Sequence, residues 1–305
     1  MRALVTGSLG FVGKYLRAEL EQNSYEVIGI DIRDGEKTVR LDLRDAAAVE
    51  RAVAELRPDV IIHLAGQANV GLSWKQPQQT VETNVICAIN LMEAVRHAAP
   101  DARMVLVGSS DEYGNLGTDG ALVSETLPAR PQTPYAVSKK AQEEMAQVYA
   151  RAYGLHICMT RSFNHGGAGQ REGFLIPDFA AGIVRVEKGL QPCLRVGNLA
   201  AERDFTHVRD VVRAYRLLAE KGRSGEIYNV GSGVTHSVQE ILDRLCAMAA
   251  APIPVERDPA KMRPSDTPVI CCDHRKLTED TGWTPLYGLD DILTETLAYW
   301  REQIR

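Results

Sequence analysis

Short apolar runs alternate with longer amphipathic segments through the first half of the chain. The apolar runs are rich in β-branched residues and have the length of buried strands; they lie at Ala3–Thr6, Val27–Asp31, Val60–Leu64, Met104–Gly108 and Ile157–Arg161. Between them, apolar residues recur at helical spacing, which predicts helices at Val12–Gln22, Ala46–Leu56, Thr80–His97 and Ser138–Tyr153. This alternation predicts an α/β fold, in which right-handed crossovers wind helices over both faces of a parallel sheet.

After Arg161 the alternation becomes less regular. The pattern predicts helices at Phe174–Lys188 and Asp210–Lys221, and one more core strand at Ile227–Val230. From Ser237, a helix, a proline-rich loop and a final helix at Asp290–Arg301 predict a smaller C-terminal lobe. Because no low-complexity linker separates the parts, we expect two intertwined units: residues 1–163 with 205–235, and residues 164–204 with 236–305. Their cleft, at the carboxyl ends of the strands, is the expected binding site.

Composition narrows the class of protein. The 305 residues carry 35 Lys and Arg against 40 Asp and Glu, and 45% of them are hydrophobic. This apolar content excludes a disordered chain, and the mild acidity argues against nucleic acid as a partner. No apolar run approaches the roughly 18 residues that span a bilayer, and the N-terminus lacks a signal-peptide pattern. We therefore expect a cytoplasmic protein whose six cysteines are reduced, with no metal site.

A glycine-rich turn joins the first predicted strand to the first predicted helix. Its sequence, Thr6-Gly7-Ser8-Leu9-Gly10-Phe11-Val12-Gly13, is a GxxGxxG pattern. Glycines at these positions tighten the turn and admit a pyrophosphate to the backbone, and free N–H groups at the helix start attract the anion. The pattern predicts a Rossmann-type dinucleotide site that includes Gly7, Gly10, Phe11, Val12 and Gly13.

Asp31, at the end of the second predicted strand, is the expected partner of the adenosine ribose. A carboxylate there accepts hydrogen bonds from the ribose diol and repels a 2′-phosphate, which favours NAD(H). Arg33 could instead pair with a 2′-phosphate, so NADP(H) remains an alternative. Further cofactor contacts are expected beside Asp31 and at the ends of the following strands, from Ile32, Arg33, Asp42, Leu43, Leu64, Ala65 and Gly66.

Acid–base chemistry is predicted by two segments. Tyr135 and Lys139 form a YxxxK motif at a helix start, where the ammonium lies one turn from the phenol and lowers its pKa. The segment Gly108-Ser109-Ser110-Asp111-Glu112-Tyr113-Gly114 follows a buried strand and brings a hydroxyl and two carboxylates to the ligand edge of the sheet. Together the segments predict a Ser110–Tyr135–Lys139 triad, with Asp111 and Glu112 as further acid–base candidates.

With these motifs, the LAG stretch at residues 64–66 and Thr83-Asn84, the chain resembles the extended short-chain dehydrogenase/reductase family that acts on nucleotide sugars. Residues 161–170, RSFNHGGAGQ, resemble the RxFNHxGPGQ segment of the GDP-6-deoxy-4-keto-mannose reductases. Residues 196–210 resemble that group's GNLxxxRDFTDVRD segment, and residues 263–265 and 281–283 resemble its RPSE and TGWKP motifs. The GDP-mannose 4,6-dehydratases share several of these features. Three positions depart from the pattern, because Ala168, His207 and Asp266 replace a Pro, an Asp and a Glu.

The resemblance implies a role for each matching residue. Tyr135 would exchange a proton with the C4 oxygen of the sugar, Lys139 would hold the nicotinamide ribose, and Ser110 would hydrogen-bond the same sugar oxygen. The backbone of Phe163 and His165 would meet the nicotinamide carboxamide. The substrate contacts implied are Asn69, Ser110, Asn164, Arg203 and Arg263, with the two arginines on the diphosphate.

Several functions remain open at this stage. A reductase needs a hydride and the Tyr135 proton, whereas a dehydratase also needs an acid and a base, which Asp111 and Glu112 could supply. The motifs favour the reductase, with the dehydratase and then an epimerase as alternatives. A non-catalytic cofactor sensor would require a broken triad, and all three members are present. The helices at Thr80–His97 and Ser138–Tyr153 are expected to pair two copies into a homodimer, and the substrate is expected to be a GDP-sugar.

Overall fold

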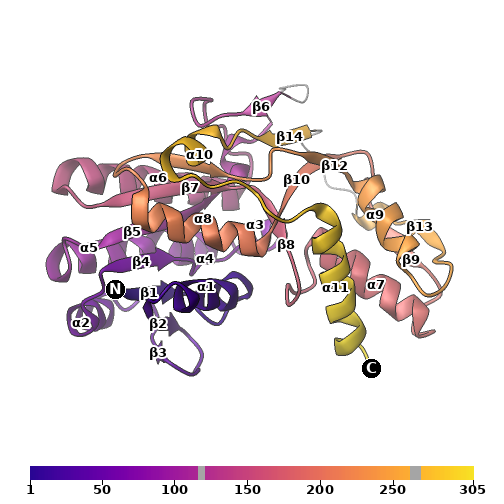
Figure 1. The fold of residues 1–305 in the computed structure, drawn as a ribbon, viewed down its shortest axis with the longest axis horizontal. Helices are drawn as coiled ribbons and strands as arrows, with labels where there is room; N and C mark the ends of the chain where they lie inside the picture. Colours follow the sequence, from indigo (N-terminus) through magenta and orange to yellow (C-terminus); the bar gives the residue numbers. More distant parts are fainter. Residues whose placement is uncertain (116–120, 262–268) are drawn as a thin grey trace.

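The computed structural model describes residues 1–115, 121–261 and 269–305. Its larger sheet is parallel throughout, in the order β11-β7-β5-β4-β1-β2-β3 (Figure 1). Its strands are β1 (Arg2–Thr6), β2 (Glu26–Asp31), β3 (Thr38–Arg40), β4 (Val60–His63), β5 (Arg103–Ser109), β7 (Ile157–Ser162) and β11 (Ile227–Val230). The strand order reverses between β1 and β4, so a ligand crevice is expected at their carboxyl ends. The predicted doubly wound α/β fold is confirmed.

Helices cover both faces of this sheet. One face packs against α1 (Phe11–Gln22), α8 (Val208–Lys221) and α10 (Arg275–Thr281), and the other against α2 (Ala46–Leu56), α5 (Cys87–Ala98) and α6 (Pro134–Tyr153). Successive residues of one strand point to opposite faces of the sheet. In β1, Ala3 and Val5 pack on the α1/α8 side, and Leu4 packs on the α2/α5 side. Because both faces are buried, the strands are continuous apolar runs, and this made them predictable from the sequence.

Capping side chains determine where the helices start. The Asp45 carboxylate accepts a hydrogen bond from Ala48 N at 3.0 Å ahead of α2. The Thr133 hydroxyl accepts one from Ala136 N at 3.0 Å ahead of α6, whose first residue is Pro134. Helix α6 therefore begins at Pro134 and not at Ser138 as predicted, which places Tyr135 in its first turn.

The helix predicted over Thr80–His97 is present, and it contains a π-helical turn that the sequence did not indicate. The structure has α3 (Val70–Lys75), α4 (Pro77–Val81), a π-helical turn η1 (Glu82–Ile86) and then α5. The wide turn directs Asn84 inward, where its side chain accepts from Gln67 N at 2.7 Å and donates to Ser138 Oγ at 2.9 Å. π turns are rare and occur often at functional sites, and no periodicity in the sequence marks this one.

The smaller lobe has its own sheets and core. The strands β12 (Thr235–Ser237), β10 (Glu202–His207), β14 (Val269–Cys272) and β6 (Leu122–Val123) pair in this order, β8 (Asn164–Gly166) pairs with β10, and β9 (Leu194–Val196) pairs with β13 (Val255–Arg257). The helices are α7 (Leu175–Glu187), α9 (Val238–Ala247) and α11 (Leu289–Gln303), with a 3-10 turn η3 at Pro259–Lys261. The helices were predictable, whereas the short strands, whose apolar residues are few, were missed.

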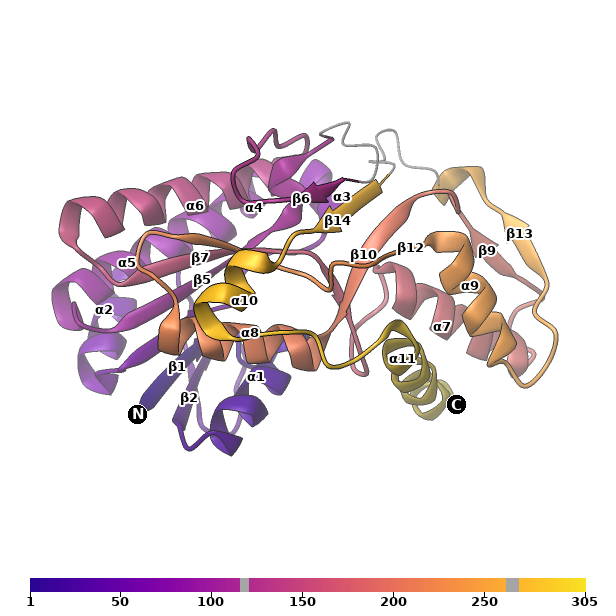
Figure 2. The same ribbon diagram turned by 45° about the horizontal axis from the view of Figure 1, so that its top comes forward.

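Segments of the chain alternate between the larger sheet and the smaller sheets. The chain passes from β10 in the smaller lobe into α8 and β11 on the larger sheet, and returns to the smaller lobe at β12 (Figure 2). The buried Asp204 carboxylate, on β10, binds across these crossings. It accepts hydrogen bonds from Ser232 N and Gly233 N, both at 2.8 Å, and from Cys272 N at 3.1 Å. A single side chain therefore joins three separate segments.

Candidate active site

The glycine-rich turn has the geometry that a dinucleotide requires. Gly7 has a φ of +69°, and a Cβ on Gly13 would lie 2.4 Å from the carbonyl oxygen of Gly7. Helix α1 starts at Phe11, directly after Gly10, which has no side chain to cap the helix N–H groups. The first N–H groups of α1 thus have no side-chain cap, and with the positive end of the helix dipole they suit a pyrophosphate, so these residues fit the predicted cofactor.

Asp31 lies at the carboxyl end of β2, beside the glycine-rich turn. Its carboxylate accepts a hydrogen bond from Leu9 N at 3.1 Å and pairs with the Arg33 guanidinium at 3.1 Å. Burial raises the pKa of Asp31, but the hydrogen bonds from Arg33 and Leu9 outweigh burial and lower it overall. Ile32 is exposed between the two charged residues. Asp31 and Arg33 therefore form one charged pair at the adenosine end of the predicted site.

The other predicted cofactor residues lie at neighbouring strand ends. Ala65 N donates to Thr6 Oγ1 at 3.2 Å, and a Cβ on Gly66 would lie 3.7 Å from Lys139 Nζ. The LAG stretch thus runs from the glycine-rich turn to the YxxxK helix. Beyond β3, Leu43 is buried, and Asp42 pairs with Arg44 at 2.6 Å, which lowers the pKa of Asp42.

Tyr135 and Lys139 lie on the first turns of α6, directed toward the end of β5. Lys139 Nζ donates to the Val107 carbonyl oxygen at 2.8 Å and to Gln142 Oε1 at 3.1 Å. Burial lowers the pKa of Lys139 to about 8. Burial raises the pKa of Tyr135, the charge of Asp111 raises it further, and a side-chain hydrogen bond with Ser109 acts in the opposite direction. The raised pKa keeps the phenol protonated, so Tyr135 can serve as a proton donor.

A hydroxyl beside Tyr135 belongs to Ser109, one residue before the predicted Ser110. Ser109 is the last residue of β5 and the N-cap of the 3-10 turn η2 (Ser110–Tyr113), where its hydroxyl accepts from Asp111 N at 3.2 Å. Of the two serines, Ser109 is the one whose side chain interacts with Tyr135 and thereby lowers the pKa of the phenol. Ser110, one residue further, is also buried. Successive residues of a strand point to opposite sides, and the sequence spacing did not distinguish between the two serines.

Glu112, the second predicted carboxylate, lies beneath the end of β5. Its side chain is fully buried, and Oε1 accepts a hydrogen bond from Ser109 N at 2.9 Å. Oε2 lies 3.7 Å from Arg161 Nε, and this arginine binds Glu143 through two hydrogen bonds of 2.8 Å. The sequence carried a signal for this arrangement, because Ser-x-x-Glu after a strand is the pattern of a capping box. Glu143 and Arg161 were missed as members of the site.

The segment at 163–170 lies against the start of α1. Phe163 is buried in a small core with Tyr113 and Val123. The ring of His165 stacks on Phe11 with the centroids 6.5 Å apart, and Tyr15 Oη donates to the Ala168 carbonyl oxygen at 2.9 Å. These contacts hold the segment over the glycine-rich turn, which is the position that its predicted cofactor role requires.

Asn69, Asn164 and Arg203, three of the predicted substrate residues, lie on the smaller lobe or on a loop that approaches it. Asn164 is exposed on β8, and Arg203 lies on β10 opposite His236 of β12. Asn69 caps α3 through a hydrogen bond from Leu72 N at 2.8 Å, and a Cβ on Gly173 would lie 3.3 Å from its amide nitrogen. Arg263 lies outside the described residues.

Comparison with known proteins identifies the family. The family model described as GDP-mannose 4,6 dehydratase matches residues 4–296. The chain is 33% identical over 305 residues to the GDP-6-deoxy-D-mannose reductase of Pseudomonas aeruginosa, covering all of this chain and 98% of the relative. It belongs to the GDP-mannose 4,6 dehydratase family.

Two solved structures share the fold over the whole length of the chain. RMD from Pseudomonas aeruginosa complexed with NADPH has a TM-score of 0.89 at 31% identity, and covers 99% of both chains. The UDP-glucose 4-epimerase of Thermus thermophilus, in complex with NAD, has a TM-score of 0.90 at 31% identity and covers 100% of both chains. The family fold is therefore shared by relatives whose names indicate different reactions.

His207 is one of the three positions that depart from the reductase pattern, and it still caps a helix. His207, which replaces an Asp, is the N-cap of α8, and its Nδ1 accepts a hydrogen bond from Arg209 N at 3.1 Å. With Nδ1 as the acceptor, the neutral ring donates from Nε2 toward Glu295 of α11, 3.3 Å away. The imidazole thus caps the helix as a carboxylate would, and it also reaches the smaller lobe.

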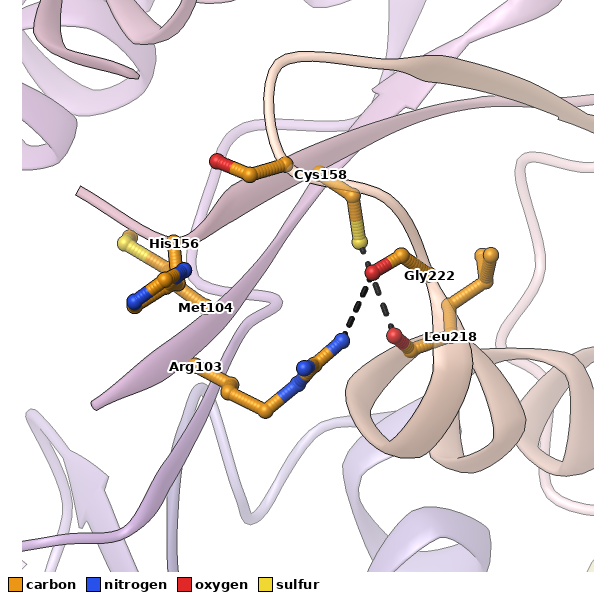
Figure 3. Close-up of a pocket in the computed structure, with 7 residues that line it drawn as sticks. Arg103, Met104, His156, Cys158, Leu218 and Gly222 are labelled. Carbon is orange, nitrogen blue, oxygen red and sulfur yellow. Dashed lines mark hydrogen bonds between the residues drawn. The ribbon is translucent and has the colours of Figure 1, made fainter. Parts of the chain in front are cut away.

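The remaining candidate features are a metal site, a membrane span and a small cavity. Within the described ranges, no group of three or more His, Cys, Asp and Glu residues is placed to hold a metal ion, and no helix is long and apolar enough to cross a membrane. A cavity of about 20 Å³ lies where β5 and β7 begin, at the edge opposite Tyr135 (Figure 3). Arg103 reaches into it and donates to the Ala219 and Gly222 carbonyl oxygens at 2.6 Å. This space holds about one water molecule and no substrate.

Proposed function

We propose that the chain is an NAD(P)H-dependent reductase of the C4 keto group of a GDP-4-keto-6-deoxy-hexose. The observation that carries this proposal is the grouping of Ser109, Tyr135 and Lys139 at one strand end, with Glu112 sealed behind it. A keto reduction needs one proton donor beside a hydride donor, and this arrangement supplies it. The 33% identity to a GDP-6-deoxy-D-mannose reductase over the full chain supports the same substrate.

The proposed chemistry assigns one step to each side chain. A bound nicotinamide supplies the hydride to C4 of the sugar. Tyr135 donates its hydroxyl proton to the C4 oxygen, and the Ser109 hydroxyl stabilises the phenolate left behind. Lys139, one helical turn along α6, adds positive charge beside that phenolate and is placed to hold the nicotinamide ribose. Ser110, whose hydroxyl follows in the same turn, is retained as a proposed contact of the substrate.

For the cofactor, we propose that both NADH and NADPH bind, with NADH preferred. Asp31 at the end of β2 is suited to the ribose diol, and the exposed Arg33 guanidinium is suited to a 2′-phosphate. A relative bound to NADPH and one bound to NAD are compatible with either choice. The remaining predicted cofactor contacts, including Asp42, Leu64 and His165, are retained in this proposal.

For the substrate, we propose that residues 164–204 and 236–305 form the nucleotide-sugar lobe and that the remaining residues form the cofactor domain. Asn164, Arg203 and Arg263 would contact the diphosphate, and Asn69 the sugar side of the cleft. A cavity of about 460 Å³ between α7 and β9 presents Asp178, Arg185 and Arg195, among other residues. A carboxylate and guanidinium groups are suited to the N–H groups and the carbonyl oxygen of guanine, which supports a GDP-linked substrate.

A second candidate is a 4,6-dehydratase, and Asp111 is the observation that favours it. Its carboxylate is only partly buried and lies close enough to Tyr135 to raise the pKa of the phenol. It could remove the C5 proton of a bound 4-keto sugar. Glu112, however, is enclosed by Ser109 and Arg161 and offers no second acid or base to the cleft.

The two candidates give different products in one experiment. We would incubate the chain with GDP-4-keto-6-deoxy-D-mannose and NADH or NADPH, and separately with GDP-mannose and NAD or NADP, and identify the products by mass spectrometry. Tyr135→Phe should lower turnover by about 10²- to 10⁴-fold in either reaction, while ligand binding persists. Asp111→Asn should leave a reductase largely active and abolish a dehydratase. Conversion of GDP-mannose alone would overturn the reductase.

The assembly and location are part of the same proposal. Val81, Ile86, Val137 and Val148 are exposed apolar residues on α4, η1 and α6, which pack against one another. Pairing of two copies through these helices would cover them, so we propose a homodimer. A cytoplasmic location is proposed because nucleotide cofactors and reduced thiols are kept there.

A further inference from the structure

A buried cluster of charged residues lies directly behind the Ser109–Tyr135 pair. It contains Glu112, Glu143 and Arg161, each with at most 3% of its surface exposed. The Arg161 guanidinium also lies over the ring of Tyr113, 4.6 Å from its centroid. Charges at this depth are costly unless they are paired, and Arg161 is paired with Glu143 through two hydrogen bonds of 2.8 Å.

Within the cluster, the carboxylate of Glu112 is attached to the backbone of Ser109. The Ser109 N–H donates to Oε1 at 2.9 Å, while the Ser109 hydroxyl accepts from Asp111 N in return. These reciprocal bonds form a capping box and determine both the peptide plane and the side-chain direction of Ser109. The same side chain lies at the end of β5, where η2 contacts α6, and its interaction with Tyr135 lowers the pKa of the phenol.

Gly108 provides the space that this contact needs. A Cβ at that position would lie 2.6 Å from Glu112 Oε1 and 2.3 Å from the Thr160 carbonyl oxygen. Because no side chain is present there, the carboxyl group can lie flat against the end of β5. On the other side, Arg161 Nε is 3.7 Å from Oε2 and holds the group from behind.

We propose that Glu112 is a positioning residue: backed by Arg161 and Glu143, its side chain orients Ser109 and thereby directs the Ser109 hydroxyl at Tyr135. This inference rests on the proposed function, because it assigns Glu112 a part in the same proton transfer. Glu112 would influence the reaction through Ser109, without contacting the substrate.

The surroundings of Glu112 also affect its protonation state. Burial raises the pKa of Glu112 well above its usual range, and the charge of Glu143 acts in the same direction. Glu143 takes the two close hydrogen bonds of Arg161, whereas Oε2 of Glu112 and Nη1 of Arg161 have no hydrogen-bond partner within the described part of the chain. Burial and the charge of Glu143 both favour the protonated form of Glu112, and glutamine reproduces its acceptor oxygen and its shape.

The test compares Glu112→Gln, which keeps the acceptor for Ser109 N, with Glu112→Met, which removes it at similar length. We expect Glu112→Gln to keep kcat within about threefold of the parent, and Glu112→Met to lower kcat by about tenfold or more with KM nearly unchanged. Because the Ser109 hydrogen bond lowers the pKa of Tyr135, the pH at which kcat falls should rise in the Met variant. Glu144→Gln, on the exposed side of α6, is the matched control and should match the parent.

A double-mutant cycle separates positioning from a general structural effect. If Glu112 acts through Ser109, Ser109→Ala and the double variant Ser109→Ala/Glu112→Met should have the same kcat within about twofold, with the same pH profile. Multiplied losses would overturn the proposal, as would a fully active Glu112→Met or a Glu112→Gln as slow as the Met variant. Should the Met variant not fold, the Gln variant still decides, since an inactive Glu112→Gln would indicate direct catalysis.

A measurement without substrate separates this proposal from the proposed function. Amide hydrogen exchange at Ser109 should be slow in the parent and in Glu112→Gln, and faster in Glu112→Met. If the parent chain fails to reduce the keto sugar, the proposed function fails, while the exchange data still test the orientation of Ser109. If exchange at Ser109 is the same in all three proteins, the positioning role fails even in an active reductase.

Discussion

Replacing Ser109 and Ser110 in turn tests which hydroxyl belongs to the proton-transfer group. Ser109→Ala removes the side chain that hydrogen-bonds Tyr135 and also the cap of η2. During reduction Tyr135 becomes a phenolate, and a hydrogen bond to a charged group is worth about 1.5–3 kcal/mol. At about 1.4 kcal/mol for each factor of ten, we expect kcat to fall by about 10- to 150-fold. Ser110→Ala removes a neighbouring hydroxyl, and we expect it to cost kcat less than about threefold.

The assay is the loss of nicotinamide absorbance with GDP-4-keto-6-deoxy-D-mannose at saturating cofactor, measured across pH. Thermal unfolding of both variants accompanies it, because the lost cap alone costs about 0.5–2 kcal/mol of stability. The change should appear in kcat and not in KM, since the bond strengthens as the phenolate forms. A Ser110→Ala variant slower than Ser109→Ala would refute the assignment and return the role to Ser110.

The remaining predictions concern the cofactor preference, the pKa of Lys139, the hydrogen bonds of Asp204 and the proposed dimer interface. Asp31→Asn should narrow the preference for NADH over NADPH, as measured by the two KM values, and an unchanged ratio would contradict the ribose contact. Since burial lowers the pKa of Lys139 to about 8, the unfolded chain binds more protons between that value and about 10.5. The parent should therefore gain about 2 kcal/mol of unfolding free energy over Lys139→Met from pH 8 to 10 in urea titrations, and equal slopes would contradict this. Asp204→Ala strands several buried donors and should cost about 3 kcal/mol in the same titrations, so a loss below about 1 kcal/mol would show that water replaces the carboxylate. Val148→Glu should convert the proposed dimer into monomers in sedimentation measurements, whereas an unaffected dimer would place the interface elsewhere.

The larger sheet was predictable because its strands are buried on both faces. Buried strands such as Val60–His63 appear as apolar runs, and capped helices such as α2 lie between them. The glycine-rich turn and the YxxxK helix were also predictable, because each role depends on local spacing. Asn84 was recognised by resemblance, but the π turn that directs it inward depends on its contacts with Gln67 and Ser138, which are distant in the sequence.

Side-chain directions at the candidate site are what the sequence could not predict. Sequence spacing places Ser109, Ser110, Asp111 and Glu112 at a strand end, but the direction of each side chain depends on how the turn closes. The capping box between Ser109 and Glu112 turns one carboxylate inward and selects the serine that reaches Tyr135. The partners that hold Glu112, on α6 and β7, are brought there only by the tertiary fold.

The position of Asp204 has a consequence for how the chain folds during synthesis. The larger sheet lacks its edge strand until residue 230 has left the ribosome, yet the partner Cys272 of Asp204 is made some 40 residues later. The core of the smaller lobe stays incomplete for longer, because it includes residues of α11, which follows Cys272 in the sequence. A nascent chain must therefore carry an incomplete, apolar lobe for much of its synthesis, during which chaperone binding competes with aggregation. Truncations within the last helix should accordingly reduce the yield of folded protein more than the activity of the molecules that do fold.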